Sequence, residues 1–162
     1  MNILYLHGLK SKLNQKKREI LEQYGDVYAP IINYEFQHIQ PKQIIRHFED
    51  TEFNVVIGSS MGGLNAFIIS EQIGRPALLF NPPLIKYMPL NFQNIYTKGL
   101  APKTIILGRK DKIVDPKETL VFLGKYSREA ELIIKIDPHL EHRIPVELFK
   151  TEVEEFFSKL CY

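Results

Sequence analysis

The sequence predicts a parallel α/β sheet that is covered by helices on both faces. Short apolar runs alternate along the chain with longer segments in which apolar residues recur at helical spacing. The short runs are mostly continuous in hydrophobicity, as expected for strands that are buried on both faces. The runs predict about six strands. Because parallel strands need crossover connections, we expect the helical segments between them to form right-handed crossovers.

Each predicted element has a local signal. The six strand-like runs are Asn2 to Leu6, Asp26 to Ala29, Phe53 to Ile57, Ala77 to Phe80, Thr104 to Leu107 and Glu131 to Ile136. The five helical patterns are Asn14 to Tyr24, Pro41 to Phe48, Leu64 to Ile73, Pro116 to Leu123 and Pro145 to Leu160. Prolines open three of these helices. Gly25, Gly74 and Gly124 are expected to end the first, third and fourth helices.

Length and composition predict one domain over residues 1–162. The chain has 44% hydrophobic and 25% charged residues, which is ordinary for a globular protein. One irregular segment, about 81–103, is rich in Pro, Asn and large apolar residues and follows the fourth predicted strand. We expect it to be a short cap-like insertion, whose apolar residues either line a shallow pocket or cover the sheet edge.

Charge and cysteine content exclude several classes of partner. A net charge of +2 is too small to indicate nucleic acid binding, and no apolar stretch has membrane-spanning length. The N-terminus lacks a basic leader region, so we expect a cytoplasmic protein without a membrane partner. The single Cys161 allows no internal disulfide and no cysteine metal cluster, and we expect no metal or organic cofactor.

The most informative motif is Gly58-Ser59-Ser60-Met61-Gly62, which fits G-x-S-x-G between a predicted strand and a predicted helix. Such a turn raises the serine hydroxyl above the sheet, and the two glycines remove β-carbons that would collide. The Met61 N–H then lies where an oxyanion would form, at the positive end of a helix. The motif makes Ser60 a candidate nucleophile, although a glycine-rich anion-binding turn has the same pattern.

The first predicted strand ends in His7-Gly8-Leu9. A His-Gly pair at this point commonly shapes the second half of an oxyanion hole, and Leu9 supplies the second backbone N–H. We interpret His7 as a support of this loop and not as a base.

The fifth predicted strand is followed by two acids, and a nucleophilic serine needs one of them to orient a histidine. Asp111 follows the strand directly, whereas Asp115 precedes Pro116 and has the position of a helix N-cap. Because capping explains Asp115 and leaves Asp111 without a structural role, we favour Asp111 as the acid.

The sixth predicted strand is followed by His139 and His142, either of which can be the base. The order Ser, acid, His along the chain is the one found in α/β-hydrolases. We favour His142, because it lies just before the last predicted helix, and we keep His139 as the alternative.

These motifs resemble the small bacterial α/β-hydrolases of the YqiA-like esterase group. The segments that carry the resemblance are Leu4-Tyr5-Leu6-His7-Gly8, Gly58-Ser59-Ser60-Met61-Gly62-Gly63 and Asn81-Pro82-Pro83. The resemblance runs from the N-terminus to about Tyr87 and returns around Asp111 and His142. One departure is that the family often has glycines before its histidine, where this chain has Asp137-Pro138-His139-Leu140-Glu141.

The resemblance implies a three-layer α/β-hydrolase fold with a minimal cap and the cleavage of short-chain carboxylic esters. It implies that Ser60 is the nucleophile, Asp111 the acid and His142 the base, with Leu9 and Met61 as oxyanion donors. A thioesterase or acyltransferase with the same three side chains is the alternative function. A non-catalytic binding module that keeps the turn for structural reasons is a further alternative.

Overall fold

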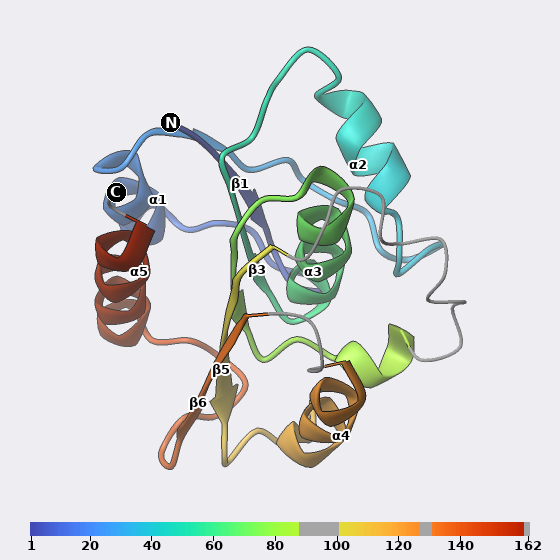
Figure 1. Ribbon diagram of the computed structural model, residues 1–162, viewed down its shortest axis with the longest axis vertical. Coiled ribbons are helices and arrows are strands. Elements are labelled where there is room, and N and C mark those ends of the chain that lie inside the picture. Colours follow the sequence, from blue (N-terminus) through green and yellow to red (C-terminus); the bar gives the residue numbers. More distant parts are fainter. Residues whose placement is uncertain (88–100, 127–130, 161–162) are drawn as a thin grey trace.

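The computed structural model describes residues 1–87, 101–126 and 131–160, and its strands form one parallel sheet in the order β2-β1-β3-β4-β5-β6 (Figure 1). The strands are β1 (Asn2–Leu6), β2 (Asp26–Tyr28), β3 (Val55–Ser59), β4 (Ala77–Phe80), β5 (Lys103–Gly108) and β6 (Leu132–Asp137). The helices are α1 (Gln15–Glu22), α2 (Pro41–His47), α3 (Met61–Ile73), the 3₁₀ helix η1 (Leu84–Tyr87), α4 (Pro116–Tyr126) and α5 (Val146–Leu160). The predicted parallel sheet with helices on both faces is confirmed.

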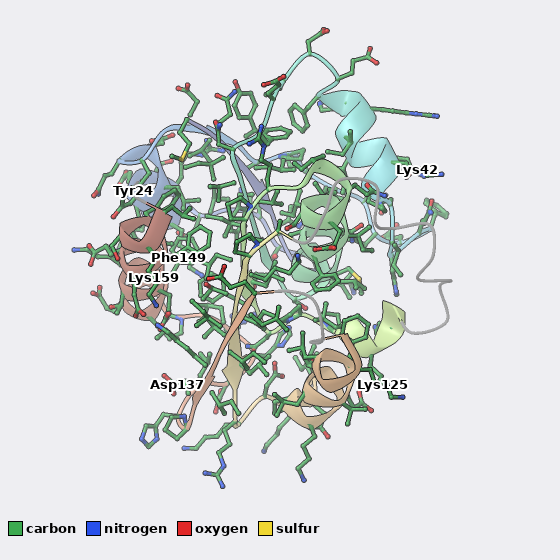
Figure 2. The ribbon with its side chains drawn as sticks, in the orientation of Figure 1. Tyr24, Lys42, Lys125, Asp137, Phe149 and Lys159 are labelled. Atoms are coloured by element: carbon green, nitrogen blue, oxygen red, sulfur yellow. The ribbon has the colours of Figure 1, made fainter. Side chains whose placement is uncertain are left out.

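Two helical layers cover the sheet. Helices α1 and α5 lie on one face, and α2, α3 and α4 lie on the other (Figure 1). Figure 2 shows Phe149 and Lys159 on α5 at one side of the molecule and Lys42 and Lys125 on α2 and α4 at the other. Asp137, at the carboxyl end of β6, marks the edge of the sheet at which the strands end (Figure 2).

Each face of the sheet has its own hydrophobic core, because successive strand residues point to opposite faces. In β1, Leu4 and Leu6 contribute to the core beneath α3, while Ile3 and Tyr5 contribute to the core beneath α5. Phe149 of α5 is buried in the second core and packs edge-on against Tyr5. The two cores hold the central strands β1, β3 and β4 from both sides, so the ends of these strands are rigid supports for a site.

The strand order creates a switch point between β1 and β3. The chain leaves β1 toward β2 on one side and leaves β3 toward β4 on the other. In open parallel sheets, ligands bind in the crevice at the carboxyl ends of strands where the chain direction diverges in this way. The predicted Ser60 and His7-Gly8-Leu9 motifs both lie at this point.

Only one of the three glycines that we expected at helix ends has that conformation. Gly74 ends α3 with a φ of 66° in the left-handed region, as predicted. Helix α1 ends earlier, at Gln23 in ordinary helical geometry, and Gly25 instead lies where a Cβ would be 2.0 Å from the carbonyl oxygen of Met1. Helix α4 continues through Gly124 to Tyr126. The expectation was therefore wrong at Gly25, where glycine permits a close backbone approach, and at Gly124, which has open space around it.

The structure describes only the two ends of the cap-like segment. Lys103 is the first residue of β5 and not part of an irregular insertion, and residues 84–87 form η1. Residues 88–100, which include the apolar Met88, Leu90 and Phe92 of the cap-like segment, lie outside the described residues.

A buried ion pair lies at the opposite edge of the sheet from the strand ends. Lys103 bonds Glu71 of α3, and both side chains are fully buried. The Lys103 ammonium also donates to the Ala101 carbonyl oxygen (2.8 Å) and lies 5.2 Å from the centre of the Phe67 ring. Burial lowers the pKa of Lys103, and the neighbouring Glu71 carboxylate opposes this shift.

None of the helices in the described part of the chain has the length and apolar composition needed to cross a bilayer.

Candidate active site

Ser60 occupies a strained turn between β3 and α3. Its φ of 54° and ψ of −122° lie in a region that residues other than glycine rarely adopt, and its backbone N–H donates to the Phe80 carbonyl oxygen (2.8 Å). Such strain costs of order 1–3 kcal/mol and is held in place only by the surrounding structure. The Ser60 hydroxyl does not cap the helix that it precedes. In the part of the chain that the structure describes, the helix cap therefore makes no use of this hydroxyl.

The glycines of the motif allow the turn to pack against β1. A Cβ at Gly62 would lie 2.1 Å from the Leu6 carbonyl oxygen, and a Cβ at Gly58 would lie 2.4 Å from the Gly62 carbonyl oxygen. A Cβ at Gly8 would lie 3.1 Å from the Ser60 Cβ. The His7-Gly8-Leu9 loop therefore lies directly against Ser60, as the sequence motifs predict.

Two backbone amides near Ser60 are candidate oxyanion donors. Among the described residues, neither the Met61 N–H nor the Leu9 N–H donates a hydrogen bond. The Met61 amide is at the first position of α3, where the helix itself provides no acceptor and where its dipole is positive. These are the two donors that the sequence predicts for an oxyanion, and both are available.

His7 has both ring nitrogens occupied within its own loop. Its Nε2 accepts from the Ile32 N–H (2.8 Å), so Nδ1 carries the proton and donates to the Gly8 carbonyl oxygen (2.6 Å). The Tyr34 hydroxyl donates to the His7 carbonyl oxygen (2.9 Å), and burial raises the pKa of Tyr34. The ring of His7 thus joins the loop after β1 to the segment after β2. This geometry agrees with the interpretation of His7 as a support.

The loops after β5 and β6 bring Asp111 and His142 together. The Nδ1 atom of His142 lies 2.7 Å from Oδ2 of Asp111, whose side chain is fully buried while that of His142 is 21% exposed. The other carboxylate oxygen of Asp111 accepts from the N–H groups of Ile113 (2.8 Å) and Val114 (2.9 Å). These bonds hold the carboxylate in one orientation. Because the Asp111 contact uses Nδ1 of His142, Nε2 is left for another partner.

Asp115 and His139, the alternative candidates for the acid and the base, have different surroundings. Asp115 is exposed, and its Oδ1 accepts from the Lys117 N–H (2.9 Å) at the start of α4, as an N-cap does. The backbone N–H of His139 donates to Asp137 (2.7 Å), and the side chain of His139 is exposed. The structure brings His142 to Asp111 and leaves Asp115 and His139 apart from this pair.

The loop that carries His142 returns from the edge strand β6 toward the centre of the sheet. It passes over the end of β5, where a Cβ at Gly108 would lie 2.5 Å from the Leu140 carbonyl oxygen. It then reaches the end of β4, where the Asn81 side chain donates to the carbonyl oxygens of Glu141 (3.0 Å) and His142 (3.2 Å). Phe80, the residue before Asn81, accepts from the Ser60 N–H. A short chain of contacts therefore links His142 to Ser60.

A pocket of about 470 Å³ opens beside the candidate oxyanion loop. Residues of the loop after β1 and of the segment after β2 line it, including Leu9, Lys10, Ile31 and Tyr34. Its size is within the range of small-molecule sites, and two of its lining residues, Leu9 and Ile31, are exposed apolar residues. Within the described ranges, no cluster of three or more side chains could hold a metal ion.

A parallel sheet with a strained serine after its central strand and a histidine–aspartate pair at the ends of later strands defines the α/β-hydrolase class. Residues 2–98 match the model of the uncharacterised protein family UPF0227, and the chain belongs to this family. The resemblance to the YqiA-like group is thereby confirmed. No curated protein shows significant similarity to the chain in sequence.

Solved structures share the fold over nearly the whole chain. A candidate hydrolase of the alpha/beta superfamily from Xanthomonas campestris pv. campestris has a TM-score of 0.71 at 18% identity, with 98% of each chain covered. The mouse alpha/beta hydrolase domain-containing protein 10 has a TM-score of 0.71 at 14% identity, covering 98% of this chain and 90% of that one. The esterase Pf2001 of Pyrococcus furiosus has a TM-score of 0.68 at 20% identity, covering 98% and 82%. These likenesses establish the α/β-hydrolase fold.

Proposed function

We propose that this protein is a serine hydrolase that cleaves short-chain carboxylic esters. The observation that supports this most directly is the 2.7 Å hydrogen bond between His142 and Asp111, on a loop that returns toward Ser60. A carboxylate at Nδ1 directs the free Nε2 of a histidine toward a nucleophile and stabilises the imidazolium that forms.

The proposed reaction has two acyl-transfer steps. His142 takes the Ser60 proton as the serine oxygen attacks the ester carbonyl, and the amides of Met61 and Leu9 hold the oxyanion. Collapse of this intermediate breaks the bond to the alcohol oxygen, which receives the proton from His142. Water then attacks the acyl-enzyme by the same route and releases the carboxylic acid. Apart from the ester and water, each step uses side chains and amides of this chain.

The proposal extends to a preference for short acyl groups, because the segment between β4 and β5 is short for a cap. Long acyl chains would project into solvent and add little binding free energy. We expect p-nitrophenyl acetate to butyrate to give the highest kcat/KM in a chain-length series. Ser60→Ala should lose turnover by on the order of a million-fold on each ester. A kcat/KM that climbs steadily toward long chains would contradict the short-chain preference, and an equally active Ser60→Ala would contradict the mechanism.

A thioesterase or an acyltransferase would use the same side chains with another leaving group or acceptor. The same protein preparation can be assayed with short acyl thioesters and with added alcohols. Faster turnover of thioesters than of matched oxygen esters, or acyl transfer to alcohol in place of hydrolysis, would replace the esterase proposal by one of these alternatives.

A further inference from the structure

The side chain of Asn81 joins the ends of three strands beside the histidine–aspartate pair. Asn81 follows β4 directly and is 2% exposed. Its Oδ1 accepts from the Gly108 N–H at the end of β5 (2.7 Å). Its Nδ2 donates to the carbonyl oxygens of Glu141 (3.0 Å) and His142 (3.2 Å) in the loop after β6.

These contacts use the acceptor and the donors of one amide at the same time. Gly108 precedes Asp111 by three residues, and its carbonyl oxygen accepts from the Asp111 N–H (3.2 Å). One side chain is therefore bonded to the backbone that leads to the acid and to the backbone of the base. An aspartate in this place has no N–H to donate, and a leucine has neither donor nor acceptor.

The backbone of Asn81 is also unusual. Its φ of 44° lies in the left-handed region, which asparagine, aspartate and glycine adopt more readily than other residues do. Its own N–H continues the sheet by donating to the Ile106 carbonyl oxygen (2.9 Å). The strained conformation places the amide under the returning loop, where a residue in an extended strand conformation would direct its side chain elsewhere.

We infer that Asn81 is a positioning residue, which holds the His142 loop over the sheet so that Nδ1 of His142 meets Asp111. This inference rests on the proposed function in so far as His142 is the base. Asn81 acts through His142 and touches no substrate. Its loss should lower kcat and leave KM nearly unchanged, since a displacement of the base by about 1 Å can cost roughly a hundredfold in rate.

Two variants remove the amide while keeping the backbone conformation. Asn81→Gly tolerates the left-handed φ, but a water molecule can occupy the space that the side chain leaves. Asn81→Asp fills the space and places carboxylate oxygen against the two carbonyl oxygens. Should Asn81→Gly yield no folded protein, Asn81→Asp carries the same test.

Thr119→Val is the matched control. The Thr119 hydroxyl is fully buried and donates to the carbonyl oxygen of Pro82 (2.9 Å), the residue after Asn81. The variant removes one buried hydrogen bond from the same segment and leaves the three contacts of the Asn81 amide in place. It therefore reproduces a loss of stability without the loss of positioning.

The experiment combines steady-state kinetics on p-nitrophenyl butyrate with proton NMR of the Nδ1–H of His142. An imidazole proton held in a short bond to a carboxylate gives a downfield, slowly exchanging resonance, and its absence in His142→Gln assigns it. We expect both Asn81 variants to lose this resonance and to lose kcat by about 10- to 100-fold with KM within about twofold. Thr119→Val should keep the resonance and the wild-type kcat.

An unchanged resonance with an unchanged kcat in the Asn81 variants would overturn the inference, as would an equal loss in Thr119→Val. A wild-type spectrum without the resonance would overturn it as well. The NMR arm does not depend on ester hydrolysis. If the wild-type protein cleaves no ester but the resonance behaves as expected, the proposed function fails and the positioning role of Asn81 stands.

Discussion

At the scale of single residues, two carboxylates only four positions apart have different partners. Asp111 is buried and bonds the imidazole of His142, whereas Asp115 is exposed and caps α4. We expect Asp111→Asn to lower kcat by roughly ten-thousand-fold with little loss of stability, because the histidine loses its charged acceptor. Asp115→Asn should leave kcat nearly intact, since asparagine caps helices about as well as aspartate. Kinetics of both variants on one ester measure this, and the reverse pattern would make Asp115 the acid.

The two histidines after β6 give a second contrast at this scale. His142 is bonded to Asp111, while the side chain of His139 is exposed. We expect His142→Ala to lose turnover by on the order of a million-fold, the cost typical of a general base that acts as a unit with its serine. His139→Ala should change turnover only modestly. An inactive His139→Ala beside an active His142→Ala would overturn the assignment of the base.

The residues that we propose for catalysis could be selected from the sequence because each lies within a few positions of a predicted strand end. Asp111 stood out from Asp115 by its distance from Pro116, a local signal. The role of Asn81 could not be predicted in this way. Its partners lie 27, 60 and 61 positions away, and they become neighbours only when β4, β5 and the loop after β6 are assembled. The Asn-Pro motif marked the position without indicating what its amide binds.

At the scale of elements, the exact ends of helices and strands could not be predicted from the local sequence. Gly25 and Gly124 each follow a predicted helix, in the position of a C-terminal glycine. In the structure, Gly25 permits the close approach of Met1, and Gly124 lies within α4. Lys103 was expected at the end of an irregular segment, yet it begins β5, and its charge is paired with Glu71 of α3 in the interior. A buried charge follows from tertiary pairing, which local propensity does not report.

The Lys103–Glu71 pair gives a prediction at this scale. Glu71→Met leaves the Lys103 ammonium buried beside the Ala101 carbonyl oxygen, and breaking such a pair costs about 3–5 kcal/mol in the free energy of unfolding. Replacing both residues by methionine should recover most of this loss, because buried ion pairs contribute little beyond a well-packed apolar pair. Urea unfolding of the two single variants and the double variant measures the effect. A double variant less stable than either single variant would contradict this expectation.

At the scale of the whole molecule, the alternation of strands and helices was sufficient to predict a parallel sheet with two covered faces. The strand order then determines where chemistry can occur, because β1 and β3 diverge at the point where Ser60 and the His7 loop meet. The pocket beside Leu9 was not predictable, since it is formed by an irregular segment after β2 that has no periodic pattern. The fold thus brings together motifs from four strand ends that lie far apart in the chain.

The central claim is that Ser60 is an activated nucleophile, and covalent labelling of the intact protein by a fluorophosphonate probe tests it most directly. Labelling, read by mass spectrometry, requires an activated serine but no knowledge of the natural substrate. We predict that wild-type protein and Ser59→Ala gain one probe adduct each, while Ser60→Ala gains none and still unfolds cooperatively. Labelling that persists in Ser60→Ala and disappears in Ser59→Ala would contradict the account.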